Sequence, residues 1–178
     1  NILKALHALD MATHSKSDTK DEENELIEPF AFDPNTPSEP TKFSISFVAE
    51  GIIYRYQLVI SKKCVYEETL YSIEAGTGII FHRTTDIEKQ LTFIDIKSRC
   101  KMKADDKKTL SNMTLWNSTV LATYKSLNIE NEHLDNVISW FTHTLMQYVD
   151  PETDIQGYIS SRIENKKIDK DEVLKLMR

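Results

Sequence analysis

The hydrophobic period changes twice along this chain, and this change limits the available folds more than any other feature. Apolar residues repeat at helical spacing over 1–13, then at every second position between residues 41 and 96. Beyond a basic stretch the helical period returns, over roughly 109–127 and 131–149. Strands grouped in one run, with helices before and after them, predict an α+β fold.

Short turns separate about five expected strands. In the first strand Phe43, Ile45 and Phe47 alternate with polar residues, as in a half-buried strand. Glu50-Gly51 and Ala75-Gly76-Thr77-Gly78 are turn signals. Consecutive strands joined by such short turns predict an antiparallel meander. The expected strands span about 43–47, 53–60, 64–73, 79–83 and 91–96.

Composition divides the chain into four segments. We expect a helix over 1–13, an acidic and proline-rich connector over 14–40, an antiparallel β-subdomain over 41–96, and a basic strip with a helical subdomain over 97–178. Four prolines surround two phenylalanines in the connector, which predicts an extended segment anchored by its aromatic rings.

The overall composition excludes several classes of protein. A net charge of −6 over 178 residues argues against a dedicated nucleic-acid coat, although it allows a local basic face. Cys64 and Cys100 have no metal-binding or redox spacing, so we expect two unpaired thiols in a cytoplasmic protein. No run of 18 apolar residues occurs, so we expect no membrane span.

The first helix begins without a start signal. Asn1-Ile2-Leu3-Lys4-Ala5-Leu6 has no capping Ser, Thr or Asp before its first apolar residue. The first four N–H groups of a helix need partners, and a phosphate-binding loop directs them at an anion. A phosphate-binding loop before this helix is therefore one common answer to its missing start signal. None of the four glycines belongs to such a loop.

The basic strip has two interpretations. Lys97, Arg99, Lys101 and Lys103 alternate with other residues, so in a strand they would share one face. They could contact the phosphates of a nucleic acid or another anionic partner. They could equally form a solvated edge strand whose charge prevents unwanted pairing. No aromatic residue lies among them, which disfavours stacking on single-stranded bases.

The sequence predicts neither catalytic residues nor a metal site. Glu67 and Glu68 are neighbours in a strand and point to opposite faces, so they cannot form a paired-carboxylate site. We expect one to be exposed and the other to be matched by Arg55 or Arg83. The histidines have no ligand spacing.

This order of segments resembles the heads of ABC-type ATPases of the RecF/SMC kind. It is most similar to bacterial AAA-annotated, ABC-like ATPases of anti-phage defence and abortive-infection systems. The opening Asn-Ile-Leu-Lys-Ala-Leu resembles the helix that follows their phosphate loop. The resemblance extends to about residue 149. It also rests on Phe43-Ser44-Ile45-Ser46-Phe47, Gly51-Ile52-Ile53-Tyr54-Arg55-Tyr56, Glu67-Glu68-Thr69-Leu70, Ile80-Phe81-His82-Arg83 and Trp140-Phe141.

The resemblance implies one lobe of an ATPase head within a P-loop NTPase fold. It also implies that Asn1 is the cofactor-binding residue close to the nucleotide. The complete head would hold ATP and Mg²⁺ between two copies, in the setting of DNA maintenance or phage defence. Its implied partners are the rest of the head, a second head, and a nucleic acid or effector protein. The phosphate loop, the Ser-Gly-Gly signature and the hydrophobic run ending in Asp-Glu are absent here, so this chain alone is expected not to bind or hydrolyse ATP.

The alternative is a non-catalytic protein-interaction module with a β-meander and a helical cap. The first helix distinguishes the two interpretations. In a module, Ile2, Leu6 and Leu9 would pack on the chain's own sheet, whereas a lobe would leave this face exposed.

Overall fold

The computed structural model describes residues 2–25, 27, 39–74, 76–145 and 156–165. The chain forms two compact units, residues 1–146 and 147–178. In the second unit the described element is α5 (Gln156–Glu164), which the sequence analysis did not predict. The proline-rich part of the connector lies outside the described residues.

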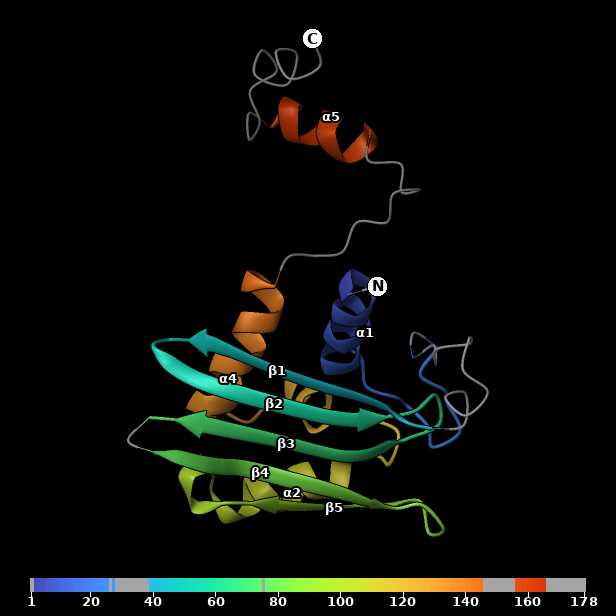
Figure 1. Cartoon of the computed structure of the whole chain (residues 1–178), viewed down its shortest axis with the longest axis vertical. Coiled ribbons are helices and arrows are strands. Elements are labelled where there is room, and N and C mark those ends of the chain that lie inside the picture. The colour runs from blue at the N-terminus through green and yellow to red at the C-terminus, as the bar shows by residue number, and fades with distance from the viewer. Residues whose placement is uncertain (1, 26, 28–38, 75, 146–155, 166–178) are drawn as a thin grey trace. The chain divides into compact units, whose positions relative to one another are not determined.

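The first unit contains a five-stranded antiparallel sheet within its described residues. Its strand order is β1-β2-β3-β4-β5, so each strand pairs with its neighbours in sequence, and the predicted meander is confirmed (Figure 1). The strands are β1 (Thr41–Ala49), β2 (Ile52–Ile60), β3 (Val65–Ile73), β4 (Thr77–Asp86) and β5 (Leu91–Ile96).

The β1–β2 hairpin shows why the turn signal was reliable. Ala49 pairs with Ile52, which leaves a two-residue loop of Glu50 and Gly51. Both loop residues have positive φ, 48° and 76°. Positive φ at both positions is the type I′ geometry, which matches the right-handed twist of paired strands.

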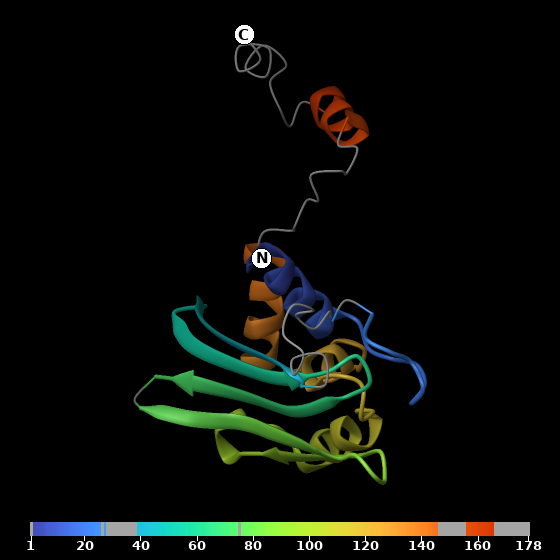
Figure 2. The same cartoon turned by 45° about the vertical axis from the view of Figure 1, so that its right-hand side comes forward.

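The helices of the first unit gather on one face of the sheet (Figures 1 and 2). They are α1 (Ile2–His14), the 3₁₀-helix η2 (Ser98–Cys100), α2 (Ala104–Met113), α3 (Val120–Lys125), α4 (Glu132–Ser139) and the π-helix η3 (Trp140–Thr144). The predicted α+β class is therefore confirmed.

Two predicted helices are divided in the structure. The single helix expected over 109–127 is α2 and α3, separated by a turn over residues 114–119. That turn is rich in Ser, Thr and Asn, whose side chains compete with helical backbone bonds. The helix expected over 131–149 begins as α4, continues as the π-helix η3, and leaves the described residues after Leu145.

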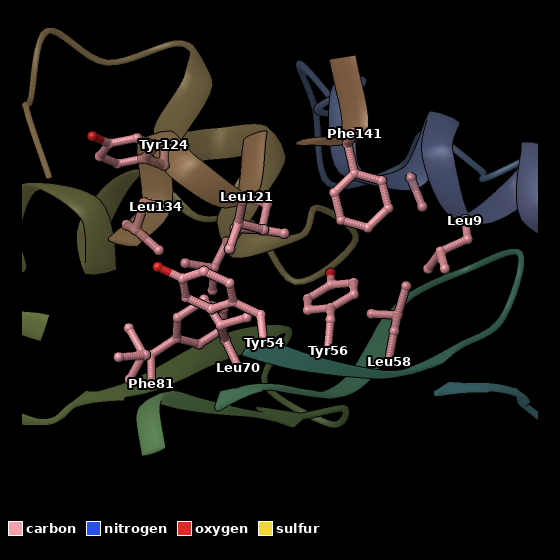
Figure 3. Packing of buried hydrophobic residues seen from close by; sticks show 14 of the residues in the cluster. Leu9, Tyr54, Tyr56, Leu58, Leu70, Phe81, Leu121, Tyr124, Leu134 and Phe141 are labelled. Atoms are coloured by element: carbon pink, nitrogen blue, oxygen red, sulfur yellow. The ribbon is translucent and has the colours of Figure 1, made fainter. Parts of the chain in front are cut away.

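The core lies between the sheet and these helices. Figure 3 shows Tyr56 and Leu58 on the sheet side, facing Leu9 and Phe141 from the helical layer. Each of these four side chains is at most 2% exposed. Full burial of a large apolar side chain stabilises a protein by roughly 1.5–3 kcal/mol. Residues of strand β2 thus pack the sheet against the helical layer.

Candidate functional site

The exposure of α1 changes along its length. Ile2 and Leu3 in its first turn are 76% and 56% exposed, whereas Leu9 is only 2% exposed. Figure 3 shows Leu9 lying above Leu58 of β2. The apolar face of α1 therefore packs on the chain's own sheet in its C-terminal half, while its first turn stays open.

Hydrogen bonds fix the C-terminal end of α1. The Thr119 hydroxyl donates to the Ala12 carbonyl over 2.7 Å, and the Ser17 N–H donates to the Ser118 hydroxyl over 2.8 Å. The last carbonyls of a helix have no partners within it, so the Thr119 bond satisfies one of them. The end of α1 is thereby joined to the turn that precedes α3.

The basic segment does not form a strand, so the predicted alternation on one face is wrong. β5 ends at Ile96, and η2 follows it. Cys100 is 1% exposed, and its carbonyl accepts a 2.6 Å hydrogen bond from the Asn131 side chain. Lys101 has a φ of 52°. The chain turns inward because the core buries Cys100 and Asn131 uses the carbonyl that a strand would have paired.

The four basic residues have different surroundings. Lys97 forms an ion pair with Asp95. Arg99 donates to the Ser72 hydroxyl over 3.3 Å and lies across Gly78, where an added Cβ would stand 2.2 Å from its Nε. Lys101 and Lys103 are exposed. Only part of the predicted phosphate-contacting strip therefore presents freely accessible ammonium groups.

A buried histidine lies near this segment. His133 is 5% exposed, with the Tyr54 hydroxyl 3.0 Å from Nδ1 and Glu74 Oε1 3.9 Å from Nε2. Burial lowers the pKa of His133, the Glu74 carboxylate opposes this effect, and the charge of Lys101 adds to it. The imidazole therefore favours its neutral form more strongly than an exposed histidine would.

The two neighbouring glutamates behave as predicted. The Glu67 side chain is 52% exposed, whereas Glu68 is fully buried opposite Arg83 in the β3–β4 register. Glu68 accepts hydrogen bonds from the Val120 N–H at 2.7 Å and the Tyr56 hydroxyl at 2.9 Å. Burial raises the pKa of Glu68, and the positive charge of Arg83 opposes that rise. Glu67 and Glu68 therefore face opposite sides of the sheet and do not form a paired-carboxylate site.

Arg83 binds backbone carbonyls from two parts of the chain. Its guanidinium donates to the Val65 carbonyl at 2.5 Å, the Trp116 carbonyl at 2.9 Å and the Leu115 carbonyl at 3.3 Å. Burial lowers the pKa of Arg83 to about 10, with Glu68 opposing. Because Glu68 binds the start of α3, the two side chains together hold the turn over residues 114–119.

The sequence analysis did not predict that the turn over residues 114–119 binds the acidic loop after α1. Trp116 Nε1 donates to the Lys20 carbonyl at 2.7 Å, and the Asn117 amide donates to the carbonyls of Thr19 at 2.8 Å and Glu22 at 3.0 Å. The turn thus fastens the acidic loop that follows α1. A cavity of about 200 Å³ lies between this loop and the Ala8 side of α1. The sequence signal for this turn was the Thr, Asn and Ser content of the segment Thr-Leu-Trp-Asn-Ser-Thr.

Potential metal ligands are not clustered in the described residues. Within them, no group of three or more His, Cys, Asp or Glu side chains could hold a metal ion. Asn1 lies outside the described residues, so its place near nucleotide stays a prediction. Cys64 and Cys100 are buried and unpaired, as predicted. None of the described helices has the length and apolar character needed to cross a membrane.

Comparison with known proteins gives a family. No curated protein and no solved structure matches the chain significantly. Residues 1–158 match the family model described as "AAA domain, putative AbiEii toxin, Type IV TA system". The match spans both the α1 helix and the whole antiparallel sheet. The chain therefore belongs to this family of AAA-type, P-loop ATPase domains.

Proposed function

We propose that this chain is the lobe of an ABC/RecF-like ATPase head that follows the phosphate-binding loop. In the complete head, α1 directs its first N–H groups at the phosphates of ATP, and the sheet supports α1 from one side. The family match over residues 1–158 supports the ATPase part of this proposal.

The open first turn of α1 is the observation that carries the proposal. Ile2 and Leu3 are exposed, although the same helix buries Leu9 against the sheet. Burying one such side chain stabilises a protein by roughly 1.5–3 kcal/mol, so an uncovered pair is a surface that a further part of the head would cover. A self-contained module would gain by covering it with its own residues.

ATP and Mg²⁺ would supply the reacting phosphate and the charge that stabilises its transfer. This chain would contribute the positive end of the α1 dipole and the packed sheet that holds α1 in position. The proposed setting is cytoplasmic, in phage defence or DNA maintenance, with two heads meeting across ATP and an effector protein as a further partner. We assign no hydrolytic step to the described residues.

Lys101 and Lys103 are the members of the basic strip that best suit contact with nucleic acid. Both are exposed, whereas Lys97 is paired with Asp95 and Arg99 lies across Gly78. Two phosphate contacts would give weak binding that falls as salt rises. In this proposal the strip guides a nucleic acid along the lobe without reading its sequence.

The test of the ATPase proposal uses the gene's complete product. A Gly-Lys-Ser or Gly-Lys-Thr immediately before Asn1 is expected, together with ATP hydrolysis by that protein. Leu3→Asp should abolish hydrolysis there, because it places a charge in the covered junction. Val48→Asp is the matched control, since Val48 is 60% exposed on the sheet, and it should leave hydrolysis unchanged.

Two results would reject the ATPase proposal: the lack of any phosphate loop before Asn1, or equal ATP hydrolysis by the Leu3→Asp protein and the control. The second candidate function, a protein-interaction module, is favoured by the packing of Leu9 on the chain's own sheet. The module interpretation predicts that neither variant changes ATP hydrolysis and that an exposed surface of the chain binds a protein partner.

A further inference from the structure

A carboxylate, an imidazole and a hydroxyl lie next to one another where α1 meets η3. His14 ends α1, and its Nε2 lies 2.9 Å from the Thr142 hydroxyl oxygen. On the other side of the ring, Nδ1 lies 2.9 Å from the Asp10 backbone carbonyl, which orients the imidazole. Asp10 Oδ1 lies 3.2 Å from Nδ1 without a hydrogen bond, so the carboxylate acts on the ring through its charge. The Asp10 and His14 side chains are 21% and 18% exposed, and Thr142 is exposed.

The neighbours of Nδ1 determine the tautomer of His14. The Asp10 carboxylate and the Asp10 carbonyl can only accept hydrogen bonds. The Thr13 hydroxyl lies 3.3 Å from Nδ1, but it donates its own hydrogen to the Asp10 carbonyl at 2.8 Å. Nδ1 therefore carries the hydrogen of the neutral ring, and Nε2 presents its lone pair to the Thr142 hydroxyl.

Both helices are held in place around this contact. The Ala12 carbonyl near the end of α1 accepts from Thr119, as described above. In η3, Trp140 stacks on Phe47 with ring centroids 4.1 Å apart, and Phe141 is 2% exposed. These anchors precede Thr142 directly, and short π-helices often occur at functional sites. The hydroxyl and the imidazole thus meet through fixed backbone positions.

We infer that Asp10, His14 and Thr142 form a general-base relay that makes the Thr142 hydroxyl a nucleophile toward small carboxylic esters. A hydroxyl within hydrogen-bond reach of a base, with the base oriented by a third group, is the arrangement that activates such nucleophiles. The inference is independent of the nucleotide proposal, because it uses none of the residues assigned to it.

The reaction transfers an acyl group to the protein. Thr142 Oγ1 attacks the ester carbonyl carbon, so an Oγ1–carbon bond forms and the bond from that carbon to the alcohol oxygen breaks. The hydroxyl proton passes to His14 Nε2 and then to the departing alcohol oxygen. Asp10 stabilises the imidazolium formed in between. The products are an acylated Thr142 and the free alcohol, and nothing is oxidised or reduced.

The test is acetylation by p-nitrophenyl acetate, mapped by mass spectrometry on the whole chain. Thr142 should gain acetyl at least about tenfold faster than Thr84, an exposed threonine on β4. His14→Asn should reduce the Thr142 rate to that of Thr84, and Asp10→Asn should reduce it in part. Thr142→Ser retains a hydroxyl and should still be acetylated.

The structural role of the contact is measured separately. Thr142→Val removes the hydroxyl and should not be acetylated at residue 142. Thermal unfolding of Thr142→Val and His14→Asn shows whether each variant is folded at the labelling temperature. If Thr142→Val is unfolded, Thr142→Ser provides the comparison at this position. If acetyl appears on lysines alone, or on Thr142 no faster than on Thr84, the relay is rejected. A Thr142 rate that is unchanged in folded His14→Asn would reject it too.

Discussion

Two charged regions of this protein differ in what their charges do. Glu68 and Arg83 are fully buried and hold the turn over residues 114–119 through backbone groups. Lys101 and Lys103 are exposed, in a segment whose shape is set by the buried Cys100 and by Asn131. In the first region the charged side chains therefore hold backbone groups in place. In the second region the charged side chains extend into solvent from a segment that other residues hold in place.

The difference has a physical cause. A buried charge loses its hydration, so it is tolerated only with an opposing charge and satisfied hydrogen bonds. An exposed lysine keeps its hydration and gains little from a neighbouring carboxylate. Substitutions in the two regions should therefore have very different effects on the free energy of unfolding.

Removing one member of the buried pair should give the largest effect. Arg83→Met leaves Glu68 buried without its opposing charge and removes the guanidinium hydrogen bonds to three backbone carbonyls, so we expect a loss of roughly 3–5 kcal/mol in unfolding free energy. Urea denaturation measures it. The double variant Arg83→Met/Glu68→Gln removes both charges and should recover part of the loss. A loss below about 1 kcal/mol for Arg83→Met would contradict this account of the pair.

Asn131→Ala should give an intermediate loss in the second region. The Asn131 side chain accepts from the Leu134 N–H at the start of α4 and donates to the Cys100 carbonyl. Losing a cap and leaving a buried carbonyl unpaired should cost roughly 1–3 kcal/mol. Urea denaturation of Asn131→Asp is the matched control, since Asp keeps the cap and loses the donor. A stability equal to that of the original protein would show that Asn131 does not shape the basic segment.

Reversing the exposed charges should hardly change stability. Lys101→Glu/Lys103→Glu should alter the unfolding free energy by less than about 0.5 kcal/mol. Any salt-dependent binding of nucleic acid, measured by fluorescence anisotropy at two salt concentrations, should be lost. Lys97→Glu is the control, because Lys97 is already paired with Asp95 and should contribute less to binding. Unchanged binding by the double variant would exclude this surface as the interface.

The smallest effect concerns the titration of His133. Burial lowers its folded-state pKa below the ordinary 6.5, so the stability gained from the neutral ring is present above pH 6.5 and is lost as pH falls through the lower folded value. Lys101→Glu should move the pKa of His133 upward, because Lys101 contributes to lowering it. NMR titration of the imidazole signals measures the pKa of His133 in the original protein and in Lys101→Glu. A downward shift would contradict the placement of Lys101 near the ring.

Sequence periodicity predicted the sheet well because its strands are local and its turns short. Alternation around Phe43 to Phe47 and the Glu50-Gly51 turn are sufficient to define the first hairpin. The same reasoning failed over residues 97–103, where alternation of basic residues resembled a strand. There the deciding interactions come from Asn131, which is distant in sequence. The division between α2 and α3 was missed for the same reason, since Arg83 and Glu68 hold it from the sheet.

The candidate site residues divide in a similar way. The opposite orientation of Glu67 and Glu68 follows from strand geometry and was predicted, as was a match with Arg83. The meeting of His14 with Thr142, 128 positions later, has no local signal. Contacts of this kind depend on how two helices pack, and periodicity describes each helix only by itself.

The sequence by itself determined the order of helix, meander and helices, because hydrophobic period and turn residues act over a few neighbouring positions. It also determined that the adjacent Glu67 and Glu68 point to opposite faces of their strand. Only the tertiary structure decided which charges are buried, which lysines remain open, and that the first turn of α1 is uncovered while Leu9 is not. Burial is a property of the packed layers, since the free energy of a charged or apolar group depends on the neighbours that replace its water.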